Sequence, residues 1–338
     1  MKRGFIGLGL NTGMPALDIV KWSKRGERNG FDSIWLSEDP YYRDSLPLMS
    51  VIAENTRRVR IATCIVNIYT KHPVYMAMAA ATVDEISEGR LVLGVGRGVK
   101  SLIEGELHIS YGSPLQYTKE YLISLRKLLA GKKVTLEGEG VNMTNAQLHF
   151  VPLRSEIPIL LAAMGPKTLN LAAEYGDGAM LNSCTSVKQA KHSAEIVSSS
   201  SRGSIKRELV CALWVSVDED VDKSYDGVRM SVAFLLSIPT FGEVFLKEGG
   251  FQTYMLEDLR RTFRWDRKVG DPMWHLGQAD ASKVRELVDD RIVDALTVCG
   301  PVEDCRRRIR DYHDVGVTTA IVNPMTSKTF AKSEELVG

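Results

Sequence analysis

The sequence lacks the patterns that mark several common protein classes. It has no run of about 18 apolar residues, so we expect no membrane-spanning helix. Its formal net charge is +1, from 43 basic and 42 acidic residues, and it has no long basic block, which argues against nucleic acid as the main partner. The apolar stretch near the start is too short and too broken by glycine for a signal peptide. We therefore expect a cytoplasmic protein that binds neither membranes nor nucleic acid.

Cysteine is scarce and scattered, and several catalytic motifs are missing. The five cysteines form no C-x-x-C pair, and no histidine is spaced to complete a zinc site with Cys299 and Cys305. We therefore predict reduced, mostly buried thiols and no metal site. The chain also has no G-x-S-x-G, H-E-x-x-H or P-loop motif, so hydrolase and NTPase functions have no support.

The most informative stretch is residues 59–98. Val59–Val66 is a β-branched run of strand length, Pro73–Ser87 is an alanine- and methionine-rich run of helix length, and Leu91–Val95 is a second apolar run. Strand, helix and strand in about forty residues make a βαβ unit, whose strands are parallel. Polar residues follow both strands, at the end of a parallel sheet where ligands bind.

The same alternation recurs along the chain. Eight strand-like segments begin near residues 5, 33, 59, 91, 159, 178, 209 and 319, with helix-like segments between them. This pattern predicts the α/β class, with a TIM (β/α)8 barrel that carries insertions. No Pro- or Gly-rich linker divides the chain, so we predict one domain over residues 1–338 with insertions at about 99–114, 131–157 and 218–281. We expect the first insertion to be loop, the second to contain a hairpin, and the third to be helical.

Two glycine-containing turns are candidates for cofactor binding. In Gly94–Gly98 the backbone N–H groups lack the shielding of Cβ atoms, so a planar ring or a phosphate can approach, although a tight barrel turn also explains these glycines. In Ala162–Lys167 a strand ends, a glycine follows, and a helix starts at Pro166. The positive end of that helix would face the ligand mouth, and Lys167 adds a charge. An ordinary strand-to-helix turn has the same pattern.

Three titratable residues follow the second and third strands. Glu38 and Asp39 end the second strand, and paired carboxylates at a barrel mouth can act as general acid and base. A helix cap or a surface turn is the alternative explanation. His72 precedes Pro73 and is therefore extended, and we expect it to form structural hydrogen bonds rather than to act as a base.

Four segments resemble the luciferase-like flavin and deazaflavin oxidoreductases. They are VNIYTKHP (Val66–Pro73), ATVDEISEGR (Ala81–Arg90), GVGRG (Gly94–Gly98) and AAMGPKTLNLAAEYGDG (Ala162–Gly178). The likeness runs from about residue 5 to residue 324 and is greatest with methylenetetrahydromethanopterin reductase, the branch that uses the deazaflavin coenzyme F420. The resemblance implies an F420-dependent oxidoreductase that moves a hydride between C5 of the deazaflavin and a carbon of a small-molecule substrate. That substrate would be 5,10-methylenetetrahydromethanopterin or a related one-carbon carrier.

The resemblance also implies site residues. The turn before Pro166 and the residues after the next strand would hold the coenzyme's phosphate tail. In the family the third strand carries a non-proline cis peptide at the place of Cys64–Ile65, in a bulge that backs the central ring, so Cys64 would pack beside the ring. With the turns above, the cofactor-binding candidates are Asp39, Cys64, Ile65, Val66, Asn67, Gly96, Arg97, Gly98, Ala163, Met164, Gly165, Pro166, Lys167, Asn182 and Ser183. The catalytic candidates are Glu38 and Asp39.

The chain departs from its relatives at three positions. At the position of Gly9 the reductase has a glutamate, and at the position of Val99 the reductase has an aspartate. Both acidic groups lie near the reacting carbon in that family. The alcohol- and sugar-oxidising relatives have a histidine in place of Asp39, so those activities are disfavoured. Two alternatives stay open, an FMN-dependent monooxygenase of the same superfamily and a flavin-binding protein without turnover. We expect a homo-oligomer, either a dimer or a tetramer.

Overall fold

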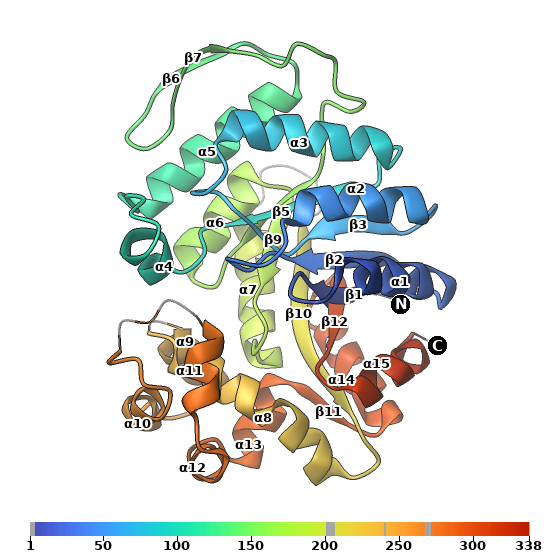
Figure 1. Cartoon of the computed structure of the whole chain (residues 1–338), viewed down its shortest axis with the longest axis vertical. Helices are drawn as coiled ribbons and strands as arrows, with labels where there is room; N and C mark the ends of the chain where they lie inside the picture. Colours follow the sequence, from blue (N-terminus) through green and yellow to red (C-terminus); the bar gives the residue numbers. More distant parts are fainter. Residues whose placement is uncertain (1–3, 201–206, 240, 268, 270–271, 338) are drawn as a thin grey trace. The chain divides into compact units, whose positions relative to one another are not determined.

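The computed structural model describes residues 4–200, 207–239, 241–267, 269 and 272–337 (Figure 1). Strands and helices alternate along this length, and the fold is the α/β TIM (β/α)8 barrel that the sequence predicts. The residues fall into two compact units. The larger comprises Phe5–Met180 and Glu195–Val210, and the smaller comprises Leu181–Ala194 and Cys211–Gly338 with Gly4. The single domain of residues 1–338 stays a prediction.

The strands of the larger unit run parallel. They are β1 (Phe5–Asn11), β2 (Ser33–Ser37), β3 (Arg60–Thr63), β4 (Val66–Asn67), β5 (Leu91–Gly96), β8 (Ile159–Ala162) and β9 (Gly178–Leu181). Each of β1, β2, β3, β5, β8 and β9 pairs with the next, and β4 pairs with β5. All six residues of β5 are buried, as expected for a parallel strand covered on both faces. Because these strands share one direction, the residues that follow them gather at one edge.

Helices cover the outside of these strands. They are α1 (Ala16–Arg28), α2 (Ser45–Asn55), α3 (Pro73–Ile86), α4 (Lys100–Gly105), α5 (Pro114–Leu129) and α6 (Pro166–Tyr175). Figure 1 shows α1, α2, α3, α5 and α6 following one another around the unit, each in contact with the next. The ends of α3 follow local rules, since Pro73 occupies its first turn and Gly89 lies just beyond its end with a φ of 81°.

One element differs from the sequence prediction, and the third strand has the break that the resemblance implies. β3 ends at Thr63, the peptide bond Cys64–Ile65 is cis, and β4 starts at Val66, so Val59–Val66 is not one continuous strand. An apolar run predicts extended backbone but does not reveal a break in the hydrogen-bond ladder. Residues 99–114, predicted to be loop, contain the six-residue helix α4. A helix of that length has too few turns to show a periodic pattern.

The two longer insertions have the predicted structure. Within the second, β6 (Val134–Glu137) and β7 (Asn142–Ala146) form an antiparallel hairpin. Within the third, the described residues are mostly helical. Its helices are α8 (Val221–Ser237), α9 (Phe241–Gly249), α10 (Met255–Thr262) and α11 (Pro272–Gln278). Residues 240, 268, 270 and 271 of this insertion lie outside the described residues.

The smaller unit contains most of one long strand and the helices that follow it. Strand β10 (Glu208–Val217) is hydrogen-bonded between β11 (Val298–Gly300) and β12 (Thr319–Pro324). The remaining helical elements are α7 (Val187–Ser200), α12 (Ala281–Leu287), α13 (Asp290–Leu296), α14 (Val302–Asp314), α15 (Ser327–Lys332) and η1 (Ser333–Leu336). No single helix in the described ranges is long and apolar enough to cross a membrane. Only α8 and α9 taken together, with a bend of 117° between them, match a span in length and composition.

Candidate active site

The parallel register brings most of the predicted site residues to one edge of the larger unit. Asn11 at the end of β1 lies opposite Ser37 at the end of β2, and Asn67 at the end of β4 lies opposite Gly96 at the end of β5. The turn before α6 follows β8, the next strand in the sheet. These residues are far apart in the sequence and meet because their strands end at the same level.

Asp39 lies just beyond β2 and is bound by the end of β1. Its Oδ2 accepts hydrogen bonds from Asn11 Nδ2 at 2.6 Å and Ser37 Oγ at 3.4 Å. Although the residue is exposed at the edge, desolvation of the carboxylate by surrounding protein atoms raises the pKa of Asp39 above its ordinary value. The two hydrogen bonds lower this pKa in part, and the charge of Glu38 raises it. Asp39 therefore holds a proton more readily than an ordinary carboxyl group.

Glu38 has a different environment from its neighbour. Its Oε2 accepts hydrogen bonds from the backbone N–H and the hydroxyl of Ser45 at 3.1 and 2.7 Å, at the start of α2. Its Oε1 lies 2.7 Å from Nζ of Lys71, and only 12% of the Glu38 side chain is exposed. This carboxylate is paired and caps a helix, as one of the two explanations from sequence expects. Its catalytic role stays a prediction.

The cis peptide bond that the resemblance implies is present between Cys64 and Ile65. Both residues are half-buried, while Val66 is buried and begins β4. Desolvation, with a smaller contribution from the charge of Asp39, raises the pKa of Cys64 to about 12. The thiol is therefore neutral at ordinary pH, which fits a packing role better than a nucleophilic one.

The glycines at the end of β5 let neighbouring segments approach. A Cβ atom at Gly96 would lie 2.9 Å from Cδ1 of Ile65 and 3.0 Å from the Cβ of Ala162. Gly98 has a φ of 64°, and a Cβ there would overlap Nδ2 of Asn67. That Nδ2 donates to the carbonyl oxygen of Arg97 at 3.3 Å. These glycines are thus required by the packing of the chain itself, the alternative that the sequence left open.

A stack of tyrosines supports the segment that follows β5. The rings of Tyr69 and Tyr111 stack with centroids 4.6 Å apart, and those of Tyr69 and Tyr117 with centroids 4.3 Å apart. The hydroxyl of Tyr69 donates to the carbonyl of Tyr111 at 2.8 Å, and that of Tyr117 donates to the carbonyl of Ile68 at 3.1 Å. The stack therefore joins the residues after β4 to the segment between α4 and α5.

The turn before α6 is open and lies near two cations. Gly165 caps α6 with extended backbone, and a Cβ atom there would meet no heavy atom within 4 Å. Nη2 of Arg97 donates to the hydroxyl of Thr168, in the first turn of α6, at 3.3 Å. Lys167 is exposed, as is Pro166, whereas Ala163 is buried and Met164 is half-buried. A helix N-terminus with an open approach and two cations suits an anion such as phosphate.

Two predicted cofactor residues belong to the smaller unit. Asn182 follows β9, and its Oδ1 accepts the backbone N–H of Ser183 at 2.8 Å. The carbonyl oxygen of Asn182 accepts the hydroxyl of Thr185 at 2.7 Å. Asn182 is half-buried and Ser183 is buried, so the contacts described for them stabilise the turn itself.

His72 and the cysteines have the structural roles predicted for them. The backbone of His72 is extended, its Nδ1 accepts the N–H of Val74 at 3.3 Å, and its Nε2 lies 3.3 Å from the carbonyl oxygen of Asn142. All five cysteines are free thiols. Among the described residues, no group of three His, Cys, Asp or Glu side chains is placed to hold a metal ion.

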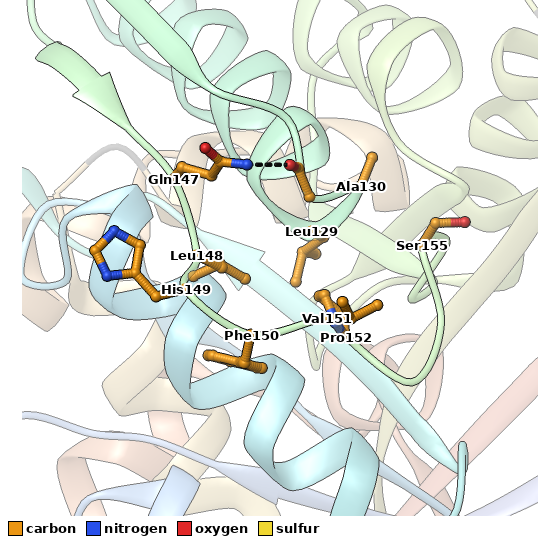
Figure 2. A pocket seen from close by; sticks show the side chains of 10 residues that line it. Leu129, Ala130, Gln147, Leu148, His149, Phe150, Val151, Pro152 and Ser155 are labelled. Atoms are coloured by element: carbon orange, nitrogen blue, oxygen red, sulfur yellow. Dashed lines mark hydrogen bonds between the residues drawn. The ribbon is translucent and has the colours of Figure 1, made fainter.

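A surface pocket of about 430 Å³ lies elsewhere in the larger unit (Figure 2). It is formed by the end of α5 and the segment between β7 and β8, where Gln147 Nε2 donates to the carbonyl of Gly131 at 3.0 Å. Its lining residues are Leu129, Ala130, Gly131, Gln147, Leu148, His149, Phe150, Val151, Pro152 and Ser155. None of the predicted site residues lines it, so this pocket is separate from the edge described above.

Sequence reasoning missed two residues at this edge. They are Asn11, which binds Asp39, and Tyr111, which stacks on Tyr69. Asn11 ends a strand, and the rule that located Asn67, Lys71 and Arg97 would have located it too. The sequence placed Lys71 at this edge but did not indicate its pairing with Glu38. Tyr111 lies within a predicted loop, and no local pattern indicated its contact.

Comparison with known proteins gives a consistent picture. A sequence model of the family described as luciferase-like monooxygenase matches residues 4–319. The chain is 29% identical to 5,10-methylenetetrahydromethanopterin reductase of Methanolobus tindarius over 332 residues, which covers 96% of this chain and 95% of that protein.

Solved structures agree with the fold. The coenzyme F420 dependent tetrahydromethanopterin reductase of Methanopyrus kandleri superposes with a TM-score of 0.83 at 23% identity, covering 99% of this chain and 97% of the other. An F420-dependent secondary alcohol dehydrogenase superposes with a TM-score of 0.77 at 22% identity, covering 99% and 98%. The family match spans most of the chain and these structures share its barrel, so the protein belongs to the luciferase-like monooxygenase family.

Proposed function

We propose that this protein is a coenzyme F420-dependent oxidoreductase that moves a hydride between C5 of the deazaflavin and a carbon of a small-molecule substrate. The observation that carries the proposal is the anion-binding arrangement at the start of α6, where an open Gly165 lies near Arg97 and Lys167. The names of the relatives, which include F420-dependent enzymes over nearly the whole length, favour F420 over FMN.

The residues fit the parts of such a coenzyme. Its phosphate would bind the N-terminus of α6, where Gly165 and Lys167 carry backbone N–H groups, Pro166 carries none, and Arg97 adds a charge. Its ring would lie against the half-buried Cys64 and Ile65, which directly precede β4 at the edge formed by β4 and β5. A neutral thiol beside a ring adds no charge to the site.

The chain would contribute positioning and proton transfer. When bound, the coenzyme supplies the hydride. Reduction of a double bond also requires a proton, and Asp39 is a carboxyl group with a raised pKa at this edge. We infer that Asp39 gives this proton in the direction of reduction and takes one back in the direction of oxidation. Glu38, held by Lys71 and Ser45, would keep the loop after β2 in place.

For the substrate we propose a one-carbon carrier, of which 5,10-methylenetetrahydromethanopterin is the first to test. Relatives from three organisms carry the name of its reductase. Gly9 lies within β1 and Val99 caps α4, so neither supplies the acidic group that the resemblance places there. Asp39 would then be the acid nearest the reacting carbon, and the pH dependence of turnover would follow its ionisation.

A fluorescence titration of the purified protein tests the cofactor. We expect F420 to bind more tightly than FMN, by about tenfold or more, which corresponds to about 1.4 kcal/mol. Clear preference for FMN would move the protein to the monooxygenase alternative. Tight binding of F420 with no turnover against a panel of one-carbon carriers, alcohols and aldehydes would favour a binding protein without activity. A cytoplasmic location and a dimer or tetramer remain predictions, which fractionation and light scattering would test.

A further inference from the structure

Asn11 is held in one orientation by contacts on both sides of its amide. Its Oδ1 accepts the backbone N–H of Gly13 at 2.6 Å. Its Nδ2 donates to Ser37 Oγ at 2.9 Å and to Asp39 Oδ2 at 2.6 Å. If the amide were flipped, its oxygen would face the carboxylate oxygen Oδ2 of Asp39 and its NH2 group would face the N–H of Gly13. The network therefore fixes which atom of Asn11 meets Asp39.

This contact distinguishes the two oxygens of Asp39. Nδ2 of Asn11 can only donate, so Oδ2 of Asp39 accepts. The hydroxyl of Ser37 also donates to Oδ2, at 3.4 Å. Among the described residues, no hydrogen bond is made to Oδ1 of Asp39. Because an unprotonated oxygen is the better acceptor for these donors, the contacts favour Oδ1 as the place of the proton on neutral Asp39.

We propose that Asn11 is a positioning residue, which binds Oδ2 of Asp39 so that Oδ1 alone carries and presents the transferable proton. The proposal rests on the proposed function in one respect, namely that Asp39 exchanges a proton with the substrate. The positioning itself is a property of the protein alone and can be measured without cofactor or substrate.

Other groups around Asp39 do not replace this contact. From the end of β1, Thr12 Oγ1 accepts the backbone N–H of Asp39 at 3.5 Å and does not reach its carboxylate as a donor. Glu38 contributes a like charge from the same loop, and Cys64 faces Asp39 from the bulge between β3 and β4. Ser37 is the remaining donor, at a longer distance than Asn11. Asn11 is therefore the main group that stabilises the ionised form.

Removing the amide should change the titration of Asp39 in a defined direction. An N–H donor favours the carboxylate over the carboxylic acid, so its loss in Asn11→Ala must raise the pKa of Asp39. Asn11→Asp places a second carboxyl group against Oδ2, and like charges at this distance raise the pKa further. Ser37→Ala removes only the longer hydrogen bond to Oδ2, so it should raise the pKa of Asp39 less than Asn11→Ala or Asn11→Asp does.

The test is a carbon-13 NMR titration of the full-length protein without ligand, with aspartate labelled at its carboxyl carbon. The signal of Asp39 is assigned as the one that disappears in Asp39→Asn. We expect the midpoint of this signal to lie at the lowest pH in wild type. It should rise in the order Ser37→Ala, Asn11→Ala and Asn11→Asp. An unchanged or lower midpoint in Asn11→Ala would overturn the proposal. Thermal unfolding of each variant checks the fold, and if Asn11→Ala does not fold, the nearly isosteric Asn11→Asp decides alone.

A turnover assay separates this inference from the proposed function. Asp39→Asn keeps an acceptor for Asn11 and a donor toward the substrate but cannot transfer a proton, so we expect a loss of kcat of about a hundredfold. In Asn11→Ala the alkaline limb of the rate profile should shift to higher pH, together with the NMR midpoint. If the midpoint moves but Asp39→Asn keeps full F420-dependent turnover, Asn11 positions Asp39 and the proton role fails. If Asp39→Asn is inactive but the midpoint does not move, the positioning by Asn11 fails and the proposed function stands.

Discussion

The glycines near the end of β5 and the glycine before α6 have opposite surroundings. A Cβ atom at Gly94 would overlap the carbonyl oxygen of Thr63, and one at Gly98 would overlap the side chain of Asn67. A Cβ atom at Gly165 would meet open space. Both segments are cofactor candidates in the sequence, with the turn before α6 the better candidate for phosphate, and the packing of the chain explains only the first set.

This difference gives a criterion for reading glycines in barrel turns. Where a neighbouring strand or side chain fills the space that a Cβ atom would take, the glycine is needed for folding. Where that space is empty and the backbone is extended, as at Gly165, folding imposes no such requirement. A glycine at such a position is explained by its place as the N-cap of the helix or by close approach of a ligand.

The sharpest test of the packed set is Gly94→Ala. The added methyl group would collide with the backbone of β3, which cannot move without disturbing its pairing with β2 and β5. We expect the free energy of unfolding to fall by about 3 kcal/mol or more, the upper end for overpacked cores. Urea unfolding followed by circular dichroism would measure this. A loss below about 1 kcal/mol would show that the close contact can relax easily.

Gly165→Val tests the open position. The valine side chain extends into free space, so the loss of stability should stay near the cost of a poorer helix cap, about 1 kcal/mol. F420 affinity should fall by about ten- to hundredfold, because the bulk blocks one or two hydrogen bonds to a charged phosphate. Gly165→Ser, which keeps a good cap with less bulk, serves as the control and should show an intermediate loss of affinity. Unchanged F420 binding in Gly165→Val would mean that this turn has no ligand role.

The smallest effect is expected for Lys167→Ala. Lys167 is exposed beside Gly165, and a solvated charge contributes less than about 1 kcal/mol, or less than about fivefold in affinity. Isothermal titration with F420 at low and high salt would measure this, and the variant should show a weaker salt dependence than wild type. A loss as large as that of Gly165→Val would assign phosphate binding to the lysine rather than to the backbone.

The fold was largely predictable from the sequence, because long apolar strands and helices of standard length repeat in order. Helix α2 was missed, since Pro47 lies near its start and obscures the helical pattern, although Asp44 accepts the N–H of Leu46 as an N-cap does. Strand β11 has three residues, Val298–Gly300, and is too short to produce a pattern. Short elements depend on tertiary contacts that the local sequence does not encode.

The sequence predicted that the candidate residues lie together beyond the strand ends, but it did not predict their hydrogen-bond and ion-pair partners. The rule that ligands bind beyond the ends of parallel strands located Asp39, Asn67, Arg97 and Gly165. It did not distinguish Glu38, bound by Lys71 and Ser45, from Asp39, bound by Asn11. Adjacent residues in a loop point in different directions, and the partner of each is set by segments distant in the sequence. The cis peptide bond was predictable only through the resemblance to a known family.

The guanidinium of Arg43 adds a dynamic consequence to the contact between Asn11 and Asp39. Its Nη1 donates to the carbonyl oxygens of Thr12 and Gly13 at 3.2 and 3.4 Å. The loop after β2 is therefore joined to the loop after β1 at two places, through Arg43 and through the contact of Asp39 with Asn11. A motion that parted the two loops would break the bonds of Arg43 along with those of Asn11. We therefore expect the two loops to move together, so that Asn11 and Asp39 keep their contact, and relaxation-dispersion NMR should find both loops exchanging at a single rate.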